Sequence, residues 1–340
     1  MIVNKWTEKG VIEMNIFDDI IGHEDIKRYF NKAIETHKVA HSYIFEGIEG
    51  VGKKTIALAV AKALLCQDGD VPCGQCKACI MVDAGTHPDI VFVEKDTKVT
   101  KIQTIRDQVV KNMEIKPYQG RYKIMMINDA DSITAEGQNA MLKTIEEPPS
   151  YGIIILITKN LAKLLPTIRS RCIHLRFNPL NREEIETYLK DKPIDRTQKE
   201  ILKQFSEGSI GVANQLIEDT QFLEMRQTSI ERLNQIERAD LIGVYRHVKE
   251  LVEHKENLIE ILQFWLLWYR DLAMVKVGER EKLYYVDYEG ALLDTSSKLT
   301  YNMICKHMDL IKETTLQIQQ NINSTLAIEN LLLKIKEKRK

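Results

Sequence analysis

The sequence predicts an α/β domain built on a parallel sheet, followed by a region that is helical throughout. Two observations support this. From about residue 14 to residue 178, short apolar runs alternate with helix-length amphipathic segments, whereas from residue 220 onwards only long amphipathic helical patterns occur. At roughly 150 residues per domain, the chain of 340 residues is long enough for two or three domains.

Five segments have the composition of strands, being rich in β-branched and other apolar residues. Most are continuously apolar, and a run that is apolar on both faces is typical of a buried parallel sheet with helices on either side. We therefore expect these strands to be buried. The five segments are residues 42–45, 90–93, 124–127, 153–157 and 173–177.

Helical patterns occupy the rest of the chain. Residues 135–147 are predicted to form a helix, which Pro148-Pro149 ends because proline cannot continue it. Shorter helices are expected at residues 180–189 and 198–205, and another from about residue 211. Trp265 lies among leucines at spacings of three and four, so we expect it in a helical core rather than in a base-stacking surface.

The charge balance limits the classes of function. Lys plus Arg total 48 and Asp plus Glu total 49, a net charge of −1. A protein that held nucleic acid mainly through its own surface would usually be markedly basic, so a role on DNA is expected to be shared with partners. No apolar run suits a membrane span, and the first twenty residues lack a signal-peptide core. We expect a cytoplasmic protein and assign no function to residues 1–13.

A glycine-rich loop lies between the first predicted strand and the helical run at residues 56–65. Glycines allow backbone N–H groups to point at an anion, the helix N-terminus adds its dipole, and a lysine adds a charge. The spacing of a glycine, four residues and then Gly-Lys, in this strand–loop–helix context, predicts a phosphate-binding loop. Its defining residues are Gly47, Gly50, Gly52 and Lys53.

Groups that ATP hydrolysis needs are missing around this loop. The residue after Lys53 is Lys54, where a Ser or Thr hydroxyl would bind magnesium. The strand at residues 124–127 is followed by Asn128 and Asp129, where a magnesium-binding Asp and a Glu are usual. We therefore expect a degenerate nucleotide site that does not hydrolyse ATP efficiently and whose binding of ATP or ADP is in doubt.

Four of the six cysteines cluster within residues 66–79. Gaps of two residues allow a tight loop to present sulfurs to one tetrahedral metal ion, and four thiolates leave no open position for a substrate. The spacing predicts a structural zinc site. An iron–sulfur cluster is the alternative, although the Cys-Pro that closes a ferredoxin-type run is absent. The four residues are Cys66, Cys73, Cys76 and Cys79.

Several longer motifs resemble one family. They are residues 41–45 (HSYIF), 85–89 (GTHPD), 139–149 (NAMLKTIEEPP) and 167–172 (TIRSRC), beside the four-cysteine insertion. Together they resemble the clamp-loader subunits of bacterial DNA polymerase III, and among these the delta-prime subunits. The resemblance covers residues 14 to about 219, and the helices beyond agree only in length and class.

The resemblance implies an AAA+-type P-loop domain with a five-stranded parallel sheet, a small helical lid domain and an all-α C-terminal collar domain. The collar of such proteins holds the loader ring together. The expected divisions are an N-terminal extension at 1–13, the AAA+-like domain at 14–178 with its zinc insertion at 66–79, the lid at 179–219 and the collar at 220–340.

The resemblance also separates delta-prime subunits from the tau/gamma motor subunits. Motor subunits carry Gly-Lys-Thr in the loop, Asp-Glu after the strand and an arginine after Gly-Ser in the lid. This chain has Lys54, Asn128-Asp129 and Gly211 at those positions. The leading hypothesis is a non-hydrolysing stator subunit of the DNA polymerase III holoenzyme. It would form a hetero-pentameric ring with tau/gamma and delta and help place the sliding clamp on primed DNA.

The sequence leaves two alternative functions. The first is an active ATPase motor subunit of the tau/gamma type, which the presence of Lys53 and the loop glycines supports. A stand-alone zinc-containing DNA-binding protein is disfavoured by the near-neutral charge. Within the leading hypothesis, Arg171 resembles the arginine of the Ser-Arg-Cys motif, which projects across a subunit interface towards a neighbour's γ-phosphate. Arg171 is thus expected to act as an arginine finger in trans, the alternative being that it pairs with an acid or caps a helix.

Overall fold

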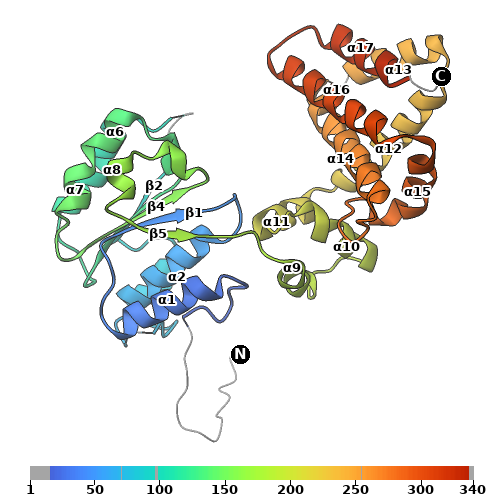
Figure 1. Ribbon diagram of the computed structural model, residues 1–340. Helices are drawn as coiled ribbons and strands as arrows, with labels where there is room; N and C mark the ends of the chain where they lie inside the picture. Colours follow the sequence, from blue (N-terminus) through green and yellow to red (C-terminus); the bar gives the residue numbers. More distant parts are fainter. Residues whose placement is uncertain (1–15, 70, 96–98, 254, 337–340) are drawn as a thin grey trace, which may run out of the picture. The chain divides into compact units, whose positions relative to one another are not determined.

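The structure is a computed structural model that describes residues 16–69, 71–95, 99–253 and 255–336 (Figure 1). The extension expected at residues 1–13 lies outside the described residues. The described chain divides into two compact units. One runs to Tyr188 and also contains Gly208–Gly211, and the other contains Leu189–Glu207 and the chain from Val212 onwards. The expected division into an AAA+-like domain, a lid and a collar stays a prediction.

Five parallel strands form one sheet in the first unit, in the order β2-β3-β4-β1-β5 (Figure 1). Parallel neighbours need crossover connections, which the helices between the strands provide. The predicted parallel sheet is confirmed, and each strand begins and ends within one residue of the expected position. The strands are β1 (Ser42–Glu46), β2 (Ile90–Val93), β3 (Lys123–Ile127), β4 (Gly152–Thr158) and β5 (Ile173–Arg176).

Two hydrophobic cores cover the two faces of this sheet. Successive side chains of a strand point to opposite faces, so Tyr43 and Phe45 of β1 pack in one core and Ile44 packs in the other. All three are fully buried. Figure 1 shows helices α1 and α2 on one face and α6, α7 and α8 on the other. Because helices cover both faces of the sheet, the side chains of the inner strands are apolar on both faces rather than alternately apolar and polar.

The helices up to residue 189 are short, and the longest are the two on the first face. The segment Ile102–Glu114 is helical throughout, with a π-helical turn (η1) between α4 and α5. The elements are α1 (Glu24–Glu35), α2 (Lys53–Leu65), α3 (Lys77–Asp83), α4 (Ile102–Ile105), η1 (Arg106–Val110), α5 (Lys111–Glu114), η2 (Ala130–Ser132), α6 (Ala135–Ala140), α7 (Leu142–Glu146), η3 (Leu161–Lys163), α8 (Pro166–Arg169) and α9 (Arg182–Leu189).

Two predictions for this unit need correction. The strand expected to be buried at residues 173–177 is largely exposed along β5, because β5 is an edge strand that pairs only with β1. Ile173 is 37% exposed, and burial is regained only at Phe177. The single helix expected at residues 135–147 is two helices, α6 and α7, which meet at Met141.

The second unit is a helical bundle around the long helix α14. Trp265 and Trp268 of α14 are buried, and Trp265 Nε1 donates a hydrogen bond of 2.8 Å to the backbone oxygen of Ser229. Trp265 is therefore a core residue, as predicted. The helices are α10 (Arg196–Phe205), α11 (Ile210–Glu218, which begins in the first unit), α12 (Phe222–Arg238), α13 (Leu241–Glu253), η4 (Lys255–Asn257), α14 (Leu258–Lys276), η5 (Val286–Tyr288), α15 (Glu289–Lys298), α16 (Tyr301–Gln319) and α17 (Ser324–Lys336).

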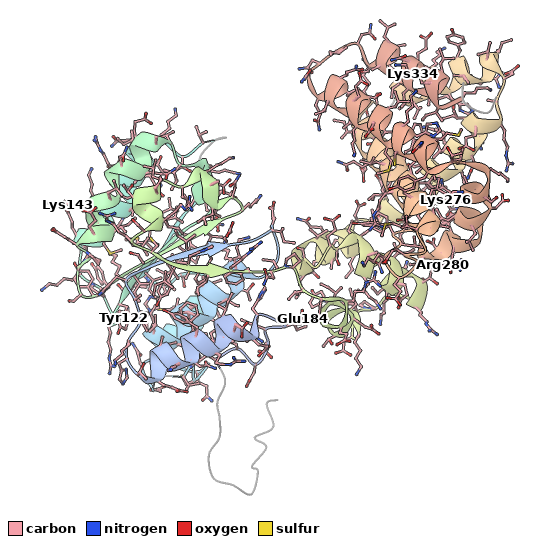
Figure 2. The ribbon with its side chains drawn as sticks, in the orientation of Figure 1. Tyr122, Lys143, Glu184, Lys276, Arg280 and Lys334 are labelled. Carbon is pink, nitrogen blue, oxygen red and sulfur yellow. The ribbon has the colours of Figure 1, made fainter. Side chains whose placement is uncertain are left out.

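Most charged side chains lie on the outside of the two units, although a few, among them Lys53, Asp89 and Asp271, are buried. Lys143 of α7 and Lys334 of α17 point away from the elements that carry them (Figure 2). Among the described residues, none of the helices combines the length and the apolar character that crossing a membrane requires. The apolar residues of the longest helices pack instead into the cores of the two units.

Candidate functional site

The glycine-rich loop joins β1 to α2, as the sequence predicts. Gly50 and Gly52 have φ angles of 70° and 107°, a region that L-residues other than glycine rarely adopt, and Gly52 is the N-cap of α2. A Cβ atom at Gly47 would lie 2.5 Å from the backbone oxygen of Phe177. Backbone conformation thus favours glycine at residues 50 and 52, and lack of space favours it at residue 47. The loop has the geometry of a phosphate-binding loop at a helix N-terminus.

Lys53 is turned back onto this loop. Its side chain is buried, and Nζ donates hydrogen bonds to the backbone oxygens of Gly47 (2.7 Å) and Ile48 (2.5 Å). Burial, followed by the positive charge of Lys159, lowers the pKa of Lys53 to about 8. The ammonium that would neutralise a bound phosphate is therefore occupied by the loop's own carbonyl groups.

The start of α11 closes against the same loop. The backbone N–H of Gly211 donates to the oxygen of Gly50 at 2.9 Å, and Ser209 Oγ donates to the oxygen of Glu49 at 2.8 Å. A Cβ atom at Gly211 would lie 2.5 Å from Cα of Gly50. No side chain fits at residue 211 without a shift of the backbone, so the position at which motor subunits carry an arginine is here filled by backbone contact.

Lysines also surround the place where magnesium would bind. Lys54 Nζ lies 3.5 Å from Glu94 Oε1 and 5.1 Å from the ring centre of Phe92. Asp129 follows β3 and is 2.9 Å from the ammonium of Lys95. Three positions would supply or orient magnesium ligands in an active site. Here they hold Lys54, which is paired with Glu94, the neutral amide Asn128, and Asp129, whose carboxylate is already paired with Lys95. This arrangement favours a degenerate site.

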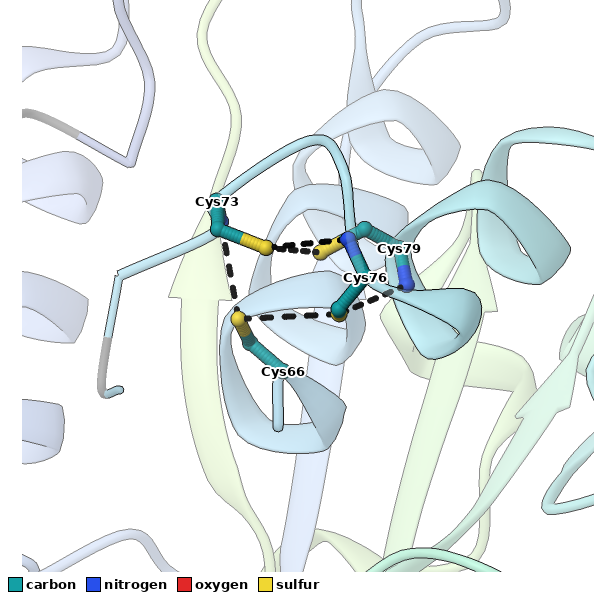
Figure 3. Close-up of side chains that lie close together, drawn as sticks. All are labelled: Cys66, Cys73, Cys76 and Cys79. Carbon is teal, nitrogen blue, oxygen red and sulfur yellow. Dashed lines mark hydrogen bonds between the residues drawn. The ribbon is translucent and has the colours of Figure 1, made fainter. Parts of the chain in front are cut away.

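The four clustered cysteines converge on one point beyond the C-terminal end of α2 (Figure 3). All four sulfurs lie within 4.8 Å of one another, with 4.0 Å between Cys66 and Cys76 and 3.9 Å between Cys73 and Cys79. A tetrahedral ion with metal–sulfur bonds of about 2.3 Å keeps its sulfurs about 3.8 Å apart. The cluster could therefore hold a metal ion.

Local backbone geometry forms this cluster. Cys66 caps the C-terminal end of α2, and Cys76 caps the N-terminal end of α3 by accepting a hydrogen bond from the Cys79 N–H at 3.4 Å. The N–H of Cys76 donates to the sulfur of Cys73 at 3.2 Å. Gly74 has a φ of 71°, which provides the turn between the second and third cysteines. N–H donors directed at sulfur favour the thiolate form that binds metal.

Arg171 lies just after α8, with its side chain 41% exposed. Its Nε is 2.8 Å from Glu146 Oε1, and its Nη1 donates to the oxygen of Thr167 at 3.0 Å and to Ser170 Oγ at 3.2 Å. Arg171 thus pairs with an acid, as the structural alternative expects. None of these partners belongs to the phosphate loop or to the cysteine cluster, so the structure presents three separate groups of candidate residues.

Comparison with known proteins agrees with the resemblance seen in the sequence. A family model described as "DNA polymerase III, delta subunit" matches residues 22–181. A DNA polymerase III subunit delta' from Bacillus subtilis (strain 168) is 28% identical over 319 residues, which cover 92% of this chain and 95% of that protein. The chain is thus similar to a delta-prime subunit over most of its length. This confirms the resemblance that the motifs indicated.

Other relatives are subunits of the gamma type. A DNA polymerase III subunit gamma from Buchnera aphidicola subsp. Schizaphis graminum is 29% identical over 244 residues, covering 69% of this chain and 65% of that protein. Among solved structures, a DNA polymerase III gamma subunit-related protein from Thermotoga maritima is matched over 92% of this chain and 99% of its own, at 15% identity and a TM-score of 0.43. The delta-prime relative thus matches more of this chain than the gamma relative does.

Some residues of the site were missed in the sequence. The sequence indicates Gly211 only as the position at which motor subunits carry an arginine. It does not predict the backbone contact of Gly211 with Gly50 or the contact of Ser209 with Glu49. Glu146 is the last residue of α7, and its pairing with Arg171 is not predicted by the sequence. The only available signal was a pair of glycines about 160 residues apart, and no local pattern connects such positions.

The closed loop leads to a prediction for Gly211. We expect Gly211→Ala to destabilise the first unit by about 1–3 kcal/mol, because the added Cβ overlaps the Gly50 backbone and forces it to shift. Gly290→Ala is the control, since Gly290 has open space around it in α15. Chemical unfolding with hydrogen exchange at residues 47–52 measures both. Equal stability of the two variants would contradict the close contact.

A second prediction concerns pH. The pKa of Lys53 is near 10.5 in the unfolded chain and about 8 in the folded one, so between these values the unfolded state binds more protons. The free energy of unfolding should therefore rise with pH across this window. We expect this rise to be smaller in Lys53→Met, measured by urea unfolding at pH values of about 7.5 and 10. Parallel changes in both proteins would show that Lys53 does not titrate there.

Proposed function

We propose that this chain is a non-hydrolysing, stator-type subunit of a DNA polymerase III clamp loader, which helps load the sliding clamp onto primed DNA. The occupied lysine and the glycine at residue 211 carry this proposal. Lys53 bonds to the loop's own carbonyls, and Gly211, in backbone contact with Gly50, stands where motor subunits carry an arginine, so neither cation that would face a bound phosphate is available. The relationship to delta-prime subunits over most of the chain supports the same role.

The partners follow from the same relationship. We infer that the chain assembles with tau/gamma and delta subunits in a hetero-pentameric ring in the cytoplasm, and that it meets the sliding clamp and DNA through the complex. The relatives are subunits of DNA polymerase III. The near-neutral charge of the chain supports contact with DNA through the complex rather than through its surface alone.

An ATPase motor is the second candidate, because the glycines and Lys53 of the phosphate loop are all present. Steady-state ATP hydrolysis by the isolated protein distinguishes the two. The stator proposal expects no hydrolysis above background, with co-purification of motor subunits when this chain is the bait. Turnover that Lys53→Ala abolishes would establish a motor instead. Failure to recover motor subunits would favour the stand-alone DNA-binding alternative.

We propose that Arg171 acts on a neighbouring subunit's nucleotide. An arginine finger neutralises the charge that develops on a transferring phosphoryl group, and its fixed, always charged fork keeps the geometry that a lysine lacks. The half-exposed side chain, held by contacts that leave part of the guanidinium accessible, supports this role. A subunit whose own site is degenerate can still contribute to hydrolysis in this way.

We propose further that the cysteine cluster binds structural zinc. Four thiolates at tetrahedral spacing fit zinc and leave no position for a substrate. Cys66, Cys73, Cys76 and Cys79 would each supply one sulfur. The metal would fix the loop between α2 and α3, which has few buried apolar residues of its own. The cluster is therefore a structural support for this unit and takes no part in hydrolysis.

Arg171→Ala tests the trans role in a loader reconstituted with its motor and delta subunits. We expect assembly to persist, while clamp- and DNA-stimulated ATP hydrolysis falls by about the share of one site, since a finger contributes about 10³–10⁵ in rate at the site that it serves. Arg169→Ala is the matched control, because Arg169 is a neighbouring exposed arginine. Unchanged hydrolysis and clamp loading in Arg171→Ala would make Arg171 a structural residue.

Metal removal tests the zinc proposal. Chelation, or Cys76→Ser, should disorder residues 66–79 while the parallel sheet persists, because binding energy is folding energy for a loop without a core. Elemental analysis measures the metal and hydrogen exchange measures the local order. Cys172→Ser is the control, since Cys172 lies outside the cluster. A purified protein without zinc, or one that absorbs visible light as iron–sulfur proteins do, would contradict the proposal.

A further inference from the structure

Arg171 is held by a carboxylate to which the proposed function gives no role. Glu146 Oε1 lies 2.8 Å from Nε of Arg171, while Nη1 is bonded to Thr167 and Ser170. Two edges of the guanidinium are therefore fixed by the chain itself. The second terminal nitrogen, Nη2, has no hydrogen bond to any residue that the structure describes. A guanidinium has five N–H donors, so it can bond to a carboxylate on one edge and a phosphate on another.

The backbones that carry the two partners are firmly anchored. Glu146 is the last residue of α7, next to Ile145, which is buried in the core on that face of the sheet. Arg171 follows α8, whose Ile168 is fully buried in the same core. The distance between the two backbones is therefore set by packing. The pair then determines only how the long arginine side chain is directed.

Helix electrostatics give no reason for a carboxylate at this position. The C-terminal end of a helix carries a partial negative charge, which disfavours a glutamate at its last residue. Glu146 is half-exposed and would lose little by facing water instead. Its contact with Arg171 is thus the interaction that accounts for its orientation.

We propose that Glu146 is a positioning residue for Arg171, fixing the guanidinium so that Nη2 faces a neighbouring subunit's phosphate. This inference rests on the proposed trans role of Arg171. A half-exposed arginine samples many rotamers, and an ion pair that favours one of them raises the fraction of time in the productive orientation. The contribution of an exposed pair is modest, so the finger-dependent hydrolysis rate should fall about 1.5- to 5-fold without it.

The test uses a loader reconstituted from the full chain and its partner subunits. Glu146→Ala should lower clamp- and DNA-stimulated hydrolysis by that factor at the served site. Glu146→Gln, which keeps an oxygen that can accept from Nε, should retain most of the rate. Glu147→Gln is the matched control, since Glu147 is an exposed neighbour without an ion pair to a described residue. Melting temperature and assembly should be unchanged in all three.

The double variant separates positioning from a structural role. In the background of Arg171→Ala, Glu146→Ala should have no further effect, because the two residues act through one another. Additive losses, or failure of Glu146→Ala to assemble, would overturn the inference, as would unchanged hydrolysis. Faster hydrolysis in Glu146→Ala would show that the glutamate restrains the finger instead. If Arg171→Ala itself leaves hydrolysis unchanged, it is the proposed trans role that fails.

Discussion

The arrangement of the first unit depends on one constraint, the parallel pairing of β1, β3 and β4. Parallel strands end at the same edge of a sheet, so the segments that follow these three strands are brought together there. The phosphate loop follows β1, Asn128-Asp129 follows β3 and Lys159 follows β4. Lys159 then pairs with Glu49 of the loop at 2.5 Å and lies 3.9 Å from Asp129. The sheet thus brings together at one edge the segments that form the nucleotide site in P-loop proteins.

The charges at this edge are balanced within the chain. In a working site, a lysine and magnesium neutralise the phosphates of the nucleotide. Here Lys53 bonds to loop carbonyls, Lys54 lies beside Glu94, and Lys95 pairs with Asp129. A nucleotide would have to displace the first of these interactions for Lys53 to reach its phosphates, and Asp129, the carboxylate that follows β3, is already paired with a cation. The basic side chains at this edge are therefore balanced by groups of the chain itself, in addition to the replacement of the usual magnesium ligands.

The sequence predicts those features that short-range patterns encode. Continuous apolar runs located strands β1 to β4 because burial on both faces leaves no alternation, and cysteine spacing located the cluster because two-residue gaps bring sulfurs together. The approach of Gly50 to Gly211 and the pair Glu146–Arg171 depend on how distant elements pack, which no local pattern contains. The exposure of β5 was missed for the same reason, since an edge strand is defined by the absence of a neighbour on one side.

A difference in exposure separates the two basic residues that the family motifs single out. Lys53 is 7% exposed and satisfied by its own loop, whereas the side chain of Arg171 is 41% exposed and only partly satisfied. A group that acts on a neighbour's phosphate must be both accessible and fixed, and these demands oppose each other, because accessible side chains are usually free to move. An ion pair to a residue on a rigid helix end resolves this conflict without burial. The proposed role of Arg171 at a surface would therefore require a partner such as Glu146.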